Sequence, residues 1–122
     1  MFWLFLSFII CETITQDGIE FSLEGNTASI TGSTCPESLT PLNIPSTITY
    51  NDQNYTVKSI GDNAFEGCKT YSITEDFIPT TITRIGVRAF AECQFHGCET
   101  LTIPSSVDTV SAEFIANVSG PS

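Results

Sequence analysis

The segment Cys93-Gln-Phe-His96-Gly-Cys98 holds two thiols and the chain's one imidazole within six residues. Thiolate sulfur and imidazole nitrogen are the ligands that structural zinc prefers, four at a time. Cys68 would be a further ligand if the fold placed it beside Cys93. The spacing differs from that of regular zinc knuckles, so we expect no metal site and no cofactor.

A disulfide is the second chemistry open to the cysteines. Cys68 and Cys93 occupy the same position of a repeat described below, 25 residues apart. Neighbouring coils bring such positions to about 5 Å, which suits the Cα separation of a disulfide. In an oxidising compartment the four mature cysteines could form two bridges in three ways, among which Cys68–Cys93 is the geometrically natural pair. Buried reduced thiols that pack as small apolar groups are the alternative.

Catalysis finds little support in the sequence. A nucleophilic thiol or hydroxyl needs a base that a third group orients, and the chain has a single histidine. No paired-carboxylate motif, phosphate loop or calcium loop is present. Fourteen acids face four bases, which argues against nucleic acid and against anionic membrane surfaces as partners. We predict a protein that is not an enzyme.

An internal repeat supplies the elements that would position these side chains. Residues 57–68 and 82–93 share the pattern aliphatic-x-x-Ile-Gly-x-x-Ala-Phe-x-x-Cys. Blocks of the type Ile-Pro-Ser-Thr-Ile recur at 44–48, 78–82 and 103–107, and the apolar positions continue into a worn third unit. A period of 25 lies within the roughly 20–29 residues of leucine-rich repeats. Stacked coils would bury each apolar position as a column.

The first two Ile-Pro blocks lie farther apart than one period. The extra residues are explained by a hairpin insertion at 49–56, in which Tyr50 and Tyr55 flank an Asn-Asp-Gln-Asn turn.

The Ile-Pro blocks and the pattern at 57–68 resemble the BspA-like, or Treponema-pallidum-type, leucine-rich repeats. Residues 18–32 resemble the hairpin that often precedes these repeats. The resemblance implies a mainly β, short leucine-rich-repeat solenoid of about three coils with an N-terminal β-hairpin cap. We expect parallel strands at the Ile-Pro blocks and turns at Ala-Phe-x-x-Cys. By resemblance the chain would be a surface antigen that adheres to host cells or extracellular matrix.

The first eleven residues form an apolar run that is too short to span a bilayer and fits a signal-peptide core. We expect a signal peptide at 1–15, cut near Thr13 or Thr15, and a cap region at 16–43. The repeats would cover 44–118, and a tail 119–122. The mature chain would be secreted or held at the cell surface, without inserting into the membrane.

Equivalent exposed positions of a solenoid form its binding face, and insertions often carry binding loops. On that basis the candidate partner-binding residues are Tyr50, Asp52, Tyr55, Lys58, Asp62 and Arg88. Two sequons, at Asn54 and Asn117, are candidate N-glycosylation sites.

Three functions remain open from the sequence. The first is an extracellular module that binds a protein of a host cell surface or of the matrix. The second is a truncated or decayed repeat fragment with no partner of its own, which would self-associate through its open solenoid end. The third is a small metal-binding protein.

Overall fold

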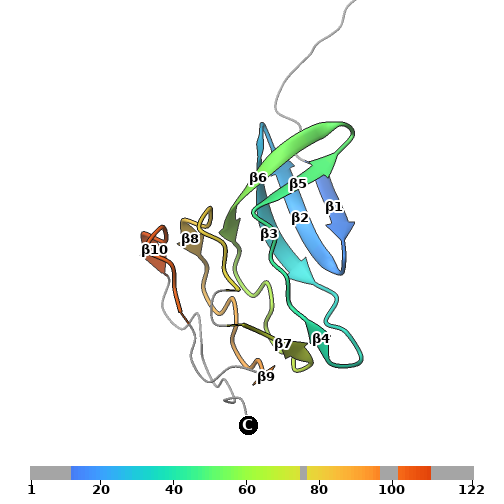
Figure 1. Cartoon of the computed structure of the whole chain (residues 1–122), viewed down its shortest axis with the longest axis vertical. Helices are drawn as coiled ribbons and strands as arrows, with labels where there is room; N and C mark the ends of the chain where they lie inside the picture. Colours follow the sequence, from blue (N-terminus) through green and yellow to red (C-terminus); the bar gives the residue numbers. More distant parts are fainter. Residues whose placement is uncertain (1–11, 75–76, 97–101, 111–122) are drawn as a thin grey trace, which may run out of the picture.

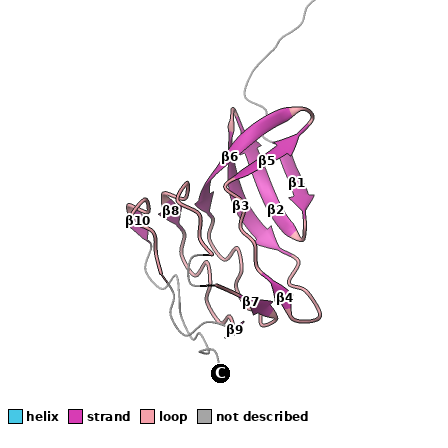
Figure 2. Cartoon of the chain, in the orientation of Figure 1, coloured by secondary structure: helices cyan, strands magenta, loops and turns pink. Residues whose placement is uncertain are grey.

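The computed structural model describes residues 12–74, 77–96 and 102–110. This part of the chain consists of strands and turns (Figures 1 and 2). It contains no helix that could cross a membrane. The strands, in chain order, are β1 (Glu12–Gln16), β2 (Ile19–Glu24), β3 (Thr27–Ser33), β4 (Thr40–Pro41), β5 (Thr47–Tyr50), β6 (Gln53–Ile60), β7 (Tyr71–Ser72), β8 (Arg84–Ile85), β9 (Phe95–His96) and β10 (Thr109–Val110).

The strands form two sheets. The larger has the order β1-β2-β3-β6-β8-β10, with β5 also paired to β6, and the smaller has the order β4-β7-β9. Along this order, pairing is antiparallel from β1 to β3 and parallel from β3 to β10. The additional strand β5 pairs antiparallel with β6. Beyond the cap, the chain passes from one sheet to the other and back, which makes the coils of a short, open solenoid (Figure 1).

The register of the parallel strands follows the repeat. Ile60 pairs with Ile85, and Ile85 pairs with Val110. Each coil therefore advances by one period, as the sequence predicts, and the worn third unit keeps the register as far as Val110. Backbone hydrogen bonds between coils fix this alignment. The Thr83 N–H donates to the Lys58 carbonyl at 2.8 Å, and the Asp108 N–H donates to the Thr83 carbonyl at 3.0 Å.

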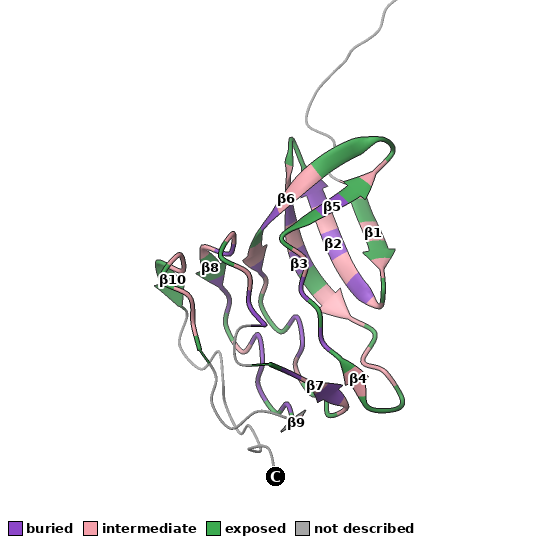
Figure 3. Cartoon of the chain, viewed as in Figure 1, coloured by how far each residue is buried: buried purple, intermediate pink, exposed green. Residues whose placement is uncertain are grey.

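The core is built from equivalent residues of successive coils. Figure 3 colours the buried stretches along the chain. Phe65 and Phe90 stack with their ring centroids 5.3 Å apart. The apolar positions of the repeat are buried as expected, in the pairs Ala64 and Ala89, Phe65 and Phe90, and Cys68 and Cys93. Identical positions thus pack against each other, as a solenoid requires.

The second and third Ile-Pro blocks are turns and not the parallel strands that we expected, whereas Thr47 and Ile48 of the first block lie in the antiparallel strand β5. The N–H of Ile82 donates to the Pro79 carbonyl at 3.2 Å, and the N–H of Val107 donates to the Pro104 carbonyl at 3.1 Å. Proline has no N–H for a sheet ladder and suits the start of such a turn. The parallel strands β8 and β10 therefore begin only after each turn has closed.

Two glycines of the repeat are needed for close contact between coils. A Cβ on Gly86 would lie 2.7 Å from the Asp62 nitrogen and 2.8 Å from the Gly61 carbonyl carbon. A Cβ on Gly61 would lie 2.9 Å from the Ile30 carbonyl oxygen. Because these neighbours are backbone atoms, they cannot move aside as a flexible side chain can.

The cap is larger than the sequence predicts. β2 and β3 form the expected hairpin, and β1 adds a further antiparallel strand, with Glu12 opposite Leu23 and Gln16 opposite Ile19. Residues 12–15, which the sequence analysis gave to the signal peptide, therefore lie in β1. The expected cut near Thr13 or Thr15 falls inside a paired strand.

Candidate partner-binding surface

The insertion forms the hairpin of β5 and β6, in which Ile48 faces Tyr55 and Tyr50 faces Gln53. Its tip is shorter than the four-residue turn that we expected. Asn51 and Asp52 make the turn with φ of 52° and 62°. Positive φ at both central residues marks a type I′ turn, whose twist matches that of the flanking strands. Asn at the first position tolerates this geometry well.

The two tyrosines of the hairpin lie on its inner face. Side chains alternate along a strand, so Tyr50 and Tyr55 share a face with the buried Ile48. Both rings are half-buried and pack against the core. They are therefore held in place by the fold, where the sequence analysis expected exposed flanks of a polar tip.

A cavity of about 290 Å³ opens between this hairpin and the cap. The Tyr50 hydroxyl donates to Glu12 Oε2 at 2.8 Å and so ties β5 to β1. Gln53 Nε2 donates to the Gly25 carbonyl at 3.0 Å, which ties β6 to the turn between β2 and β3. We call this cavity the tyrosine pocket; it is lined by Glu12, Leu23, Gly25, Tyr50, Asn51, Gln53 and Tyr55.

The pocket carries one negative charge and no positive one. The hydrogen bond to the Glu12 carboxylate, followed by the charge of that carboxylate, raises the pKa of Tyr50. None of the chain's four bases lines the pocket. Glu12 was not among the predicted binding residues, because it lies within the expected signal peptide at 1–15.

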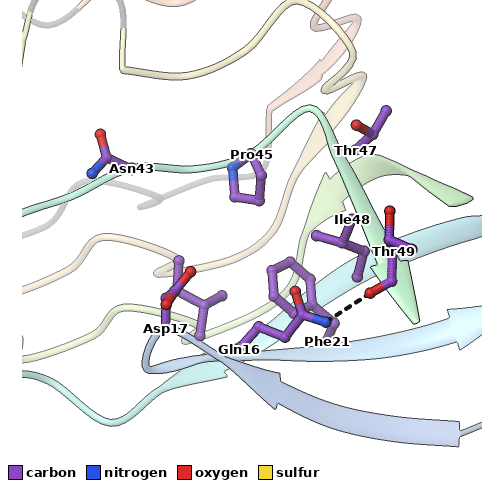
Figure 4. A pocket seen from close by; sticks show the side chains of 9 residues that line it. Gln16, Asp17, Phe21, Asn43, Pro45, Thr47, Ile48 and Thr49 are labelled. Atoms are coloured by element: carbon purple, nitrogen blue, oxygen red, sulfur yellow. Dashed lines mark hydrogen bonds between the residues drawn. The ribbon is translucent and has the colours of Figure 1, made fainter. Parts of the chain in front are cut away.

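A second cavity, of about 370 Å³, lies where the turn after β1 meets the segment before β5 (Figure 4). Its lining includes the apolar side chains of Phe21 and Ile48. Gln16 Nε2 donates to the Thr49 carbonyl at 3.1 Å, a second link between β1 and β5 (Figure 4).

The other predicted binding residues are not gathered at one place. Asp52 is exposed at the hairpin tip, and Lys58 is exposed on β6. Asp62 lies in a coil turn, where its carboxylate accepts the Val87 N–H at 2.8 Å. The structure thus brings Tyr50 and Tyr55 together at one pocket and places Asp62 in the coils.

Arg88 is engaged within its own part of the solenoid. Its guanidinium lies 2.8 Å from Glu66 and 3.1 Å from Glu92. The hydrogen bond that Arg88 donates is the main cause that lowers the pKa of Glu66, and a hydrogen bond from Asn63 lowers it further. Arg88 therefore links two coils, which is a structural use of a residue expected to contact a partner.

A row of polar residues crosses the parallel sheet and was not predicted. Ser29, Ser59, Arg84 and Thr109 stand in register on four neighbouring strands. Ser59 Oγ donates to Ser29 Oγ at 2.8 Å, while Arg84 and Thr109 are exposed. The signal was present, because three of these residues are one period apart and each precedes a column of aliphatic residues.

The cysteines pair differently from our expectation. Cys68 bonds to Cys35, with the Cα atoms 5.2 Å apart, and Cys93 is a buried free thiol. Cys93 Sγ donates to the Phe65 carbonyl at 2.9 Å, and burial raises its pKa to about 11. Cys35 precedes the repeat and has no periodic mate, so the repeat pattern contains no signal for this bridge.

The residues of the suspected zinc cluster have other roles where the structure describes them. His96 Nε2 lies 3.1 Å from the Lys69 carbonyl oxygen, and Cys98 lies outside the described residues. Within residues 12–74, 77–96 and 102–110, no three His, Cys, Asp or Glu side chains are placed to share a metal ion. Of the two sequons, Asn54 is exposed on β6, and Asn117 also lies outside the described residues.

Comparison with known proteins agrees with this architecture. The family model for the BspA type leucine rich repeat region, which holds six copies, matches residues 37–120, well over half of the chain. A leucine-rich repeat protein from Bacteroides capillosus is 24% identical at a TM-score of 0.63, and the match covers 89% of this chain and 96% of that one. No curated protein matches the chain.

Two further solved structures are longer. A leucine rich cell surface protein from Faecalibacterium prausnitzii is 21% identical at a TM-score of 0.48, over 88% of this chain and 42% of that one. A leucine-rich repeat protein from Bacteroides ovatus is 23% identical at a TM-score of 0.41, over 84% of this chain and 42% of that one. The chain thus spans less than half the length of both.

Proposed function

Because the chain belongs to the BspA-type leucine-rich repeat family, we propose that it is an exported binding module. Its partner is a protein of a host cell surface or of the extracellular matrix. Leucine-rich repeat families generally act through protein interactions and not through catalysis, and we propose the same for this chain. The contact is made by the tyrosine pocket and the tip of the β5–β6 hairpin.

The observation that carries this proposal is the placement of Tyr50 and Tyr55 around one pocket on a hairpin that the fold holds at several points. Tyrosine is enriched in protein interfaces, where its ring supplies contact area and its hydroxyl supplies a hydrogen bond. Two links from β1, to Tyr50 and to Thr49, fix the hairpin against the cap. A surface held in this way loses little conformational entropy on binding.

Two features support export. The apolar run at 1–11 has the length of a signal-peptide core. The Cys35–Cys68 bridge belongs to oxidising compartments, since cytosolic thiols are kept reduced. We place the end of the leader before Glu12, because a later cut would remove residues of β1. Exposed Asn54 would then carry a glycan if the cell has the N-glycosylation pathway.

Export is tested by mass spectrometry of the native chain in culture medium, on the cell surface and inside the cells. Extracellular material that starts at or before Glu12 is the expected result. A start after Thr15 would contradict the retention of β1. Intact Met1 found only inside cells would contradict export.

Binding is tested by titrating the labelled, purified chain onto intact host cells and onto immobilised matrix proteins. Saturable binding to at least one of these surfaces, which unlabelled chain competes away, is the expected result. Unsaturable binding of equal strength on all surfaces would contradict a specific partner.

One observation favours the alternative of a repeat fragment without a partner of its own. Val110, on the last described strand, is 43% exposed. Exposed apolar surface on such a strand favours self-association. Sedimentation over a hundredfold range of concentration separates the two functions, because a binding module stays monomeric and an open fragment grows in mass. A metal analysis of the purified chain that finds no bound metal would exclude the metal-binding alternative.

A further inference from the structure

We infer that the tyrosine pocket binds an arginine side chain from a basic segment of the partner. This inference rests on the proposed function and names the chemistry that the pocket recognises. Glu12, the two tyrosine rings and the size of the pocket each support it.

Glu12 gives the pocket a negative charge that no basic side chain of the described residues neutralises. Its Oε2 accepts the Tyr50 hydroxyl at 2.8 Å. In the part of the chain that the structure describes, its Oε1 has no hydrogen-bond partner and no base forms an ion pair with it. The donors that bind a free carboxylate oxygen best are charged, and the planar guanidinium group can offer two at once.

The rings of Tyr50 and Tyr55 supply the second feature. Both line the pocket, and Leu23, which is 2% exposed, lines it as well. A guanidinium group stacks favourably on the face of an aromatic ring, and the methylene stem of arginine packs on apolar surface. Lysine lacks the planar group and would gain less from the rings.

The size and the rim of the pocket fit one long side chain. Its volume is about 290 Å³. Pockets for small ligands begin at about 300 Å³, so this pocket lies at the lower limit of their size. Gln53 uses its amide nitrogen on the Gly25 carbonyl, which leaves its amide oxygen to accept from a ligand. The formal charge of −10 on the whole chain would also draw a basic segment toward it.

The test uses the purified full chain and a labelled peptide, Gly-Arg-Gly-Arg-Gly, with binding followed by fluorescence anisotropy. A second peptide carries citrulline in place of arginine, which keeps the shape and removes the charge. A third peptide carries lysine. The variant Glu12→Gln removes the pocket charge, and Glu37→Gln removes one charge from an exposed residue outside the pocket.

We expect the dissociation constant of the arginine peptide to rise about tenfold in Glu12→Gln, the size expected for a lost charge-assisted contact. In Glu37→Gln it should change less than about twofold. Tyr55→Leu, which keeps apolar volume and removes the ring, should weaken binding several-fold while the thermal midpoint of unfolding stays close to that of the natural chain. The citrulline peptide should not bind, and the lysine peptide should bind more weakly than the arginine peptide.

Equal losses in Glu12→Gln and Glu37→Gln would overturn the inference, because they would assign the binding to diffuse charge. Equal affinity for arginine and citrulline, or no binding of the arginine peptide to the natural chain, would overturn it too. The proposed function fails separately. If a partner protein binds the natural chain and Glu12→Gln with equal affinity, the arginine site is wrong and the binding module stands.

Discussion

Phe65 and Phe90 stack across neighbouring coils with their rings inclined by 2° and their centroids 5.3 Å apart. The pair shows how one period of the sequence becomes one step of the solenoid. Neither ring can be buried by its own coil, so each coil depends on the next for its core. Phe77 packs edge-on against Phe90 at a centroid distance of 5.7 Å and extends the cluster.

Replacing Phe90 by alanine should lower the free energy of unfolding by about 3–5 kcal/mol, because the change removes a buried ring and leaves a cavity. Val87→Ala is the control, since Val87 is 41% exposed in the turn of the same coil. This substitution should lower the free energy of unfolding by less than about 0.5 kcal/mol. Urea unfolding followed by circular dichroism measures both, and equal costs would contradict the column model of the core.

The disulfide gives a second prediction. Cys35 and Cys68 are 33 residues apart, so reducing the bridge should lower the free energy of unfolding by about 3–4 kcal/mol. Cys35→Ala should show the same loss without reductant and no further response to it. Cys93→Ala should keep the full response. If Cys93→Ala abolished the effect of reductant, the bridge would join Cys68 to Cys93.

The free thiol predicts a dependence on alkaline pH. Burial raises the pKa of Cys93 from 9.0 to about 11. Between these values the unfolded chain loses the proton and the folded chain keeps it. The stability linked to this thiol is therefore fully present below pH 9 and is lost as the pH rises toward 11.

Unfolding free energies measured across that range should fall more steeply for the natural chain than for Cys93→Ala. Equal slopes for the two chains would show that burial does not raise the pKa of Cys93. In the folded chain at neutral pH, iodoacetamide should leave Cys93 unmodified, because the protonated thiol is a poor nucleophile. Modification should begin only when the chain is unfolded.

Gly86→Ala should destabilise the solenoid by about 1–3 kcal/mol, because the added carbon would overlap backbone atoms of the preceding coil. Gly25→Ala provides a contrast. Its added carbon would meet nothing within 4 Å, although its φ of +62° carries some strain, and we expect a loss of about 1 kcal/mol. Should Gly86→Ala prove the milder of the two in thermal unfolding, the close approach of coils would not explain this glycine.

The solenoid could be predicted because its signal repeats. Each buried column appears in the sequence at a fixed interval, so the pairing of Ile60, Ile85 and Val110 follows from the period of 25. The positions of the strands could not be read in the same way. The Ile-Pro blocks are apolar enough for strands, but proline has no N–H for a sheet ladder, and the second and third blocks form turns.

The candidate site lies mostly outside the repeat, and therefore much of it was not predictable. The tyrosines of the insertion could be singled out, since an insertion breaks the period. Glu12 could not, because it directly follows an apolar run in the sequence and its pairing with β2 depends on tertiary contacts. Cys35 raised the same difficulty, since its position before the first coil gives no repeat spacing from which to infer a partner.

The most direct test of the binding function compares two double variants on the cell or matrix surface that binds the natural chain. Tyr50→Ser/Tyr55→Ser removes both rings of the pocket, and Arg84→Ser/Val87→Ser changes two exposed residues of the coils. Tyr55→Leu serves as a milder variant if the first pair unfolds the cap. We predict a loss of at least about tenfold in affinity for the tyrosine pair, as for interface hot spots. The coil pair should bind like the natural chain. Full binding by a folded tyrosine pair, with a loss in the coil pair, would contradict the account and move the interface to the exposed face of the parallel sheet.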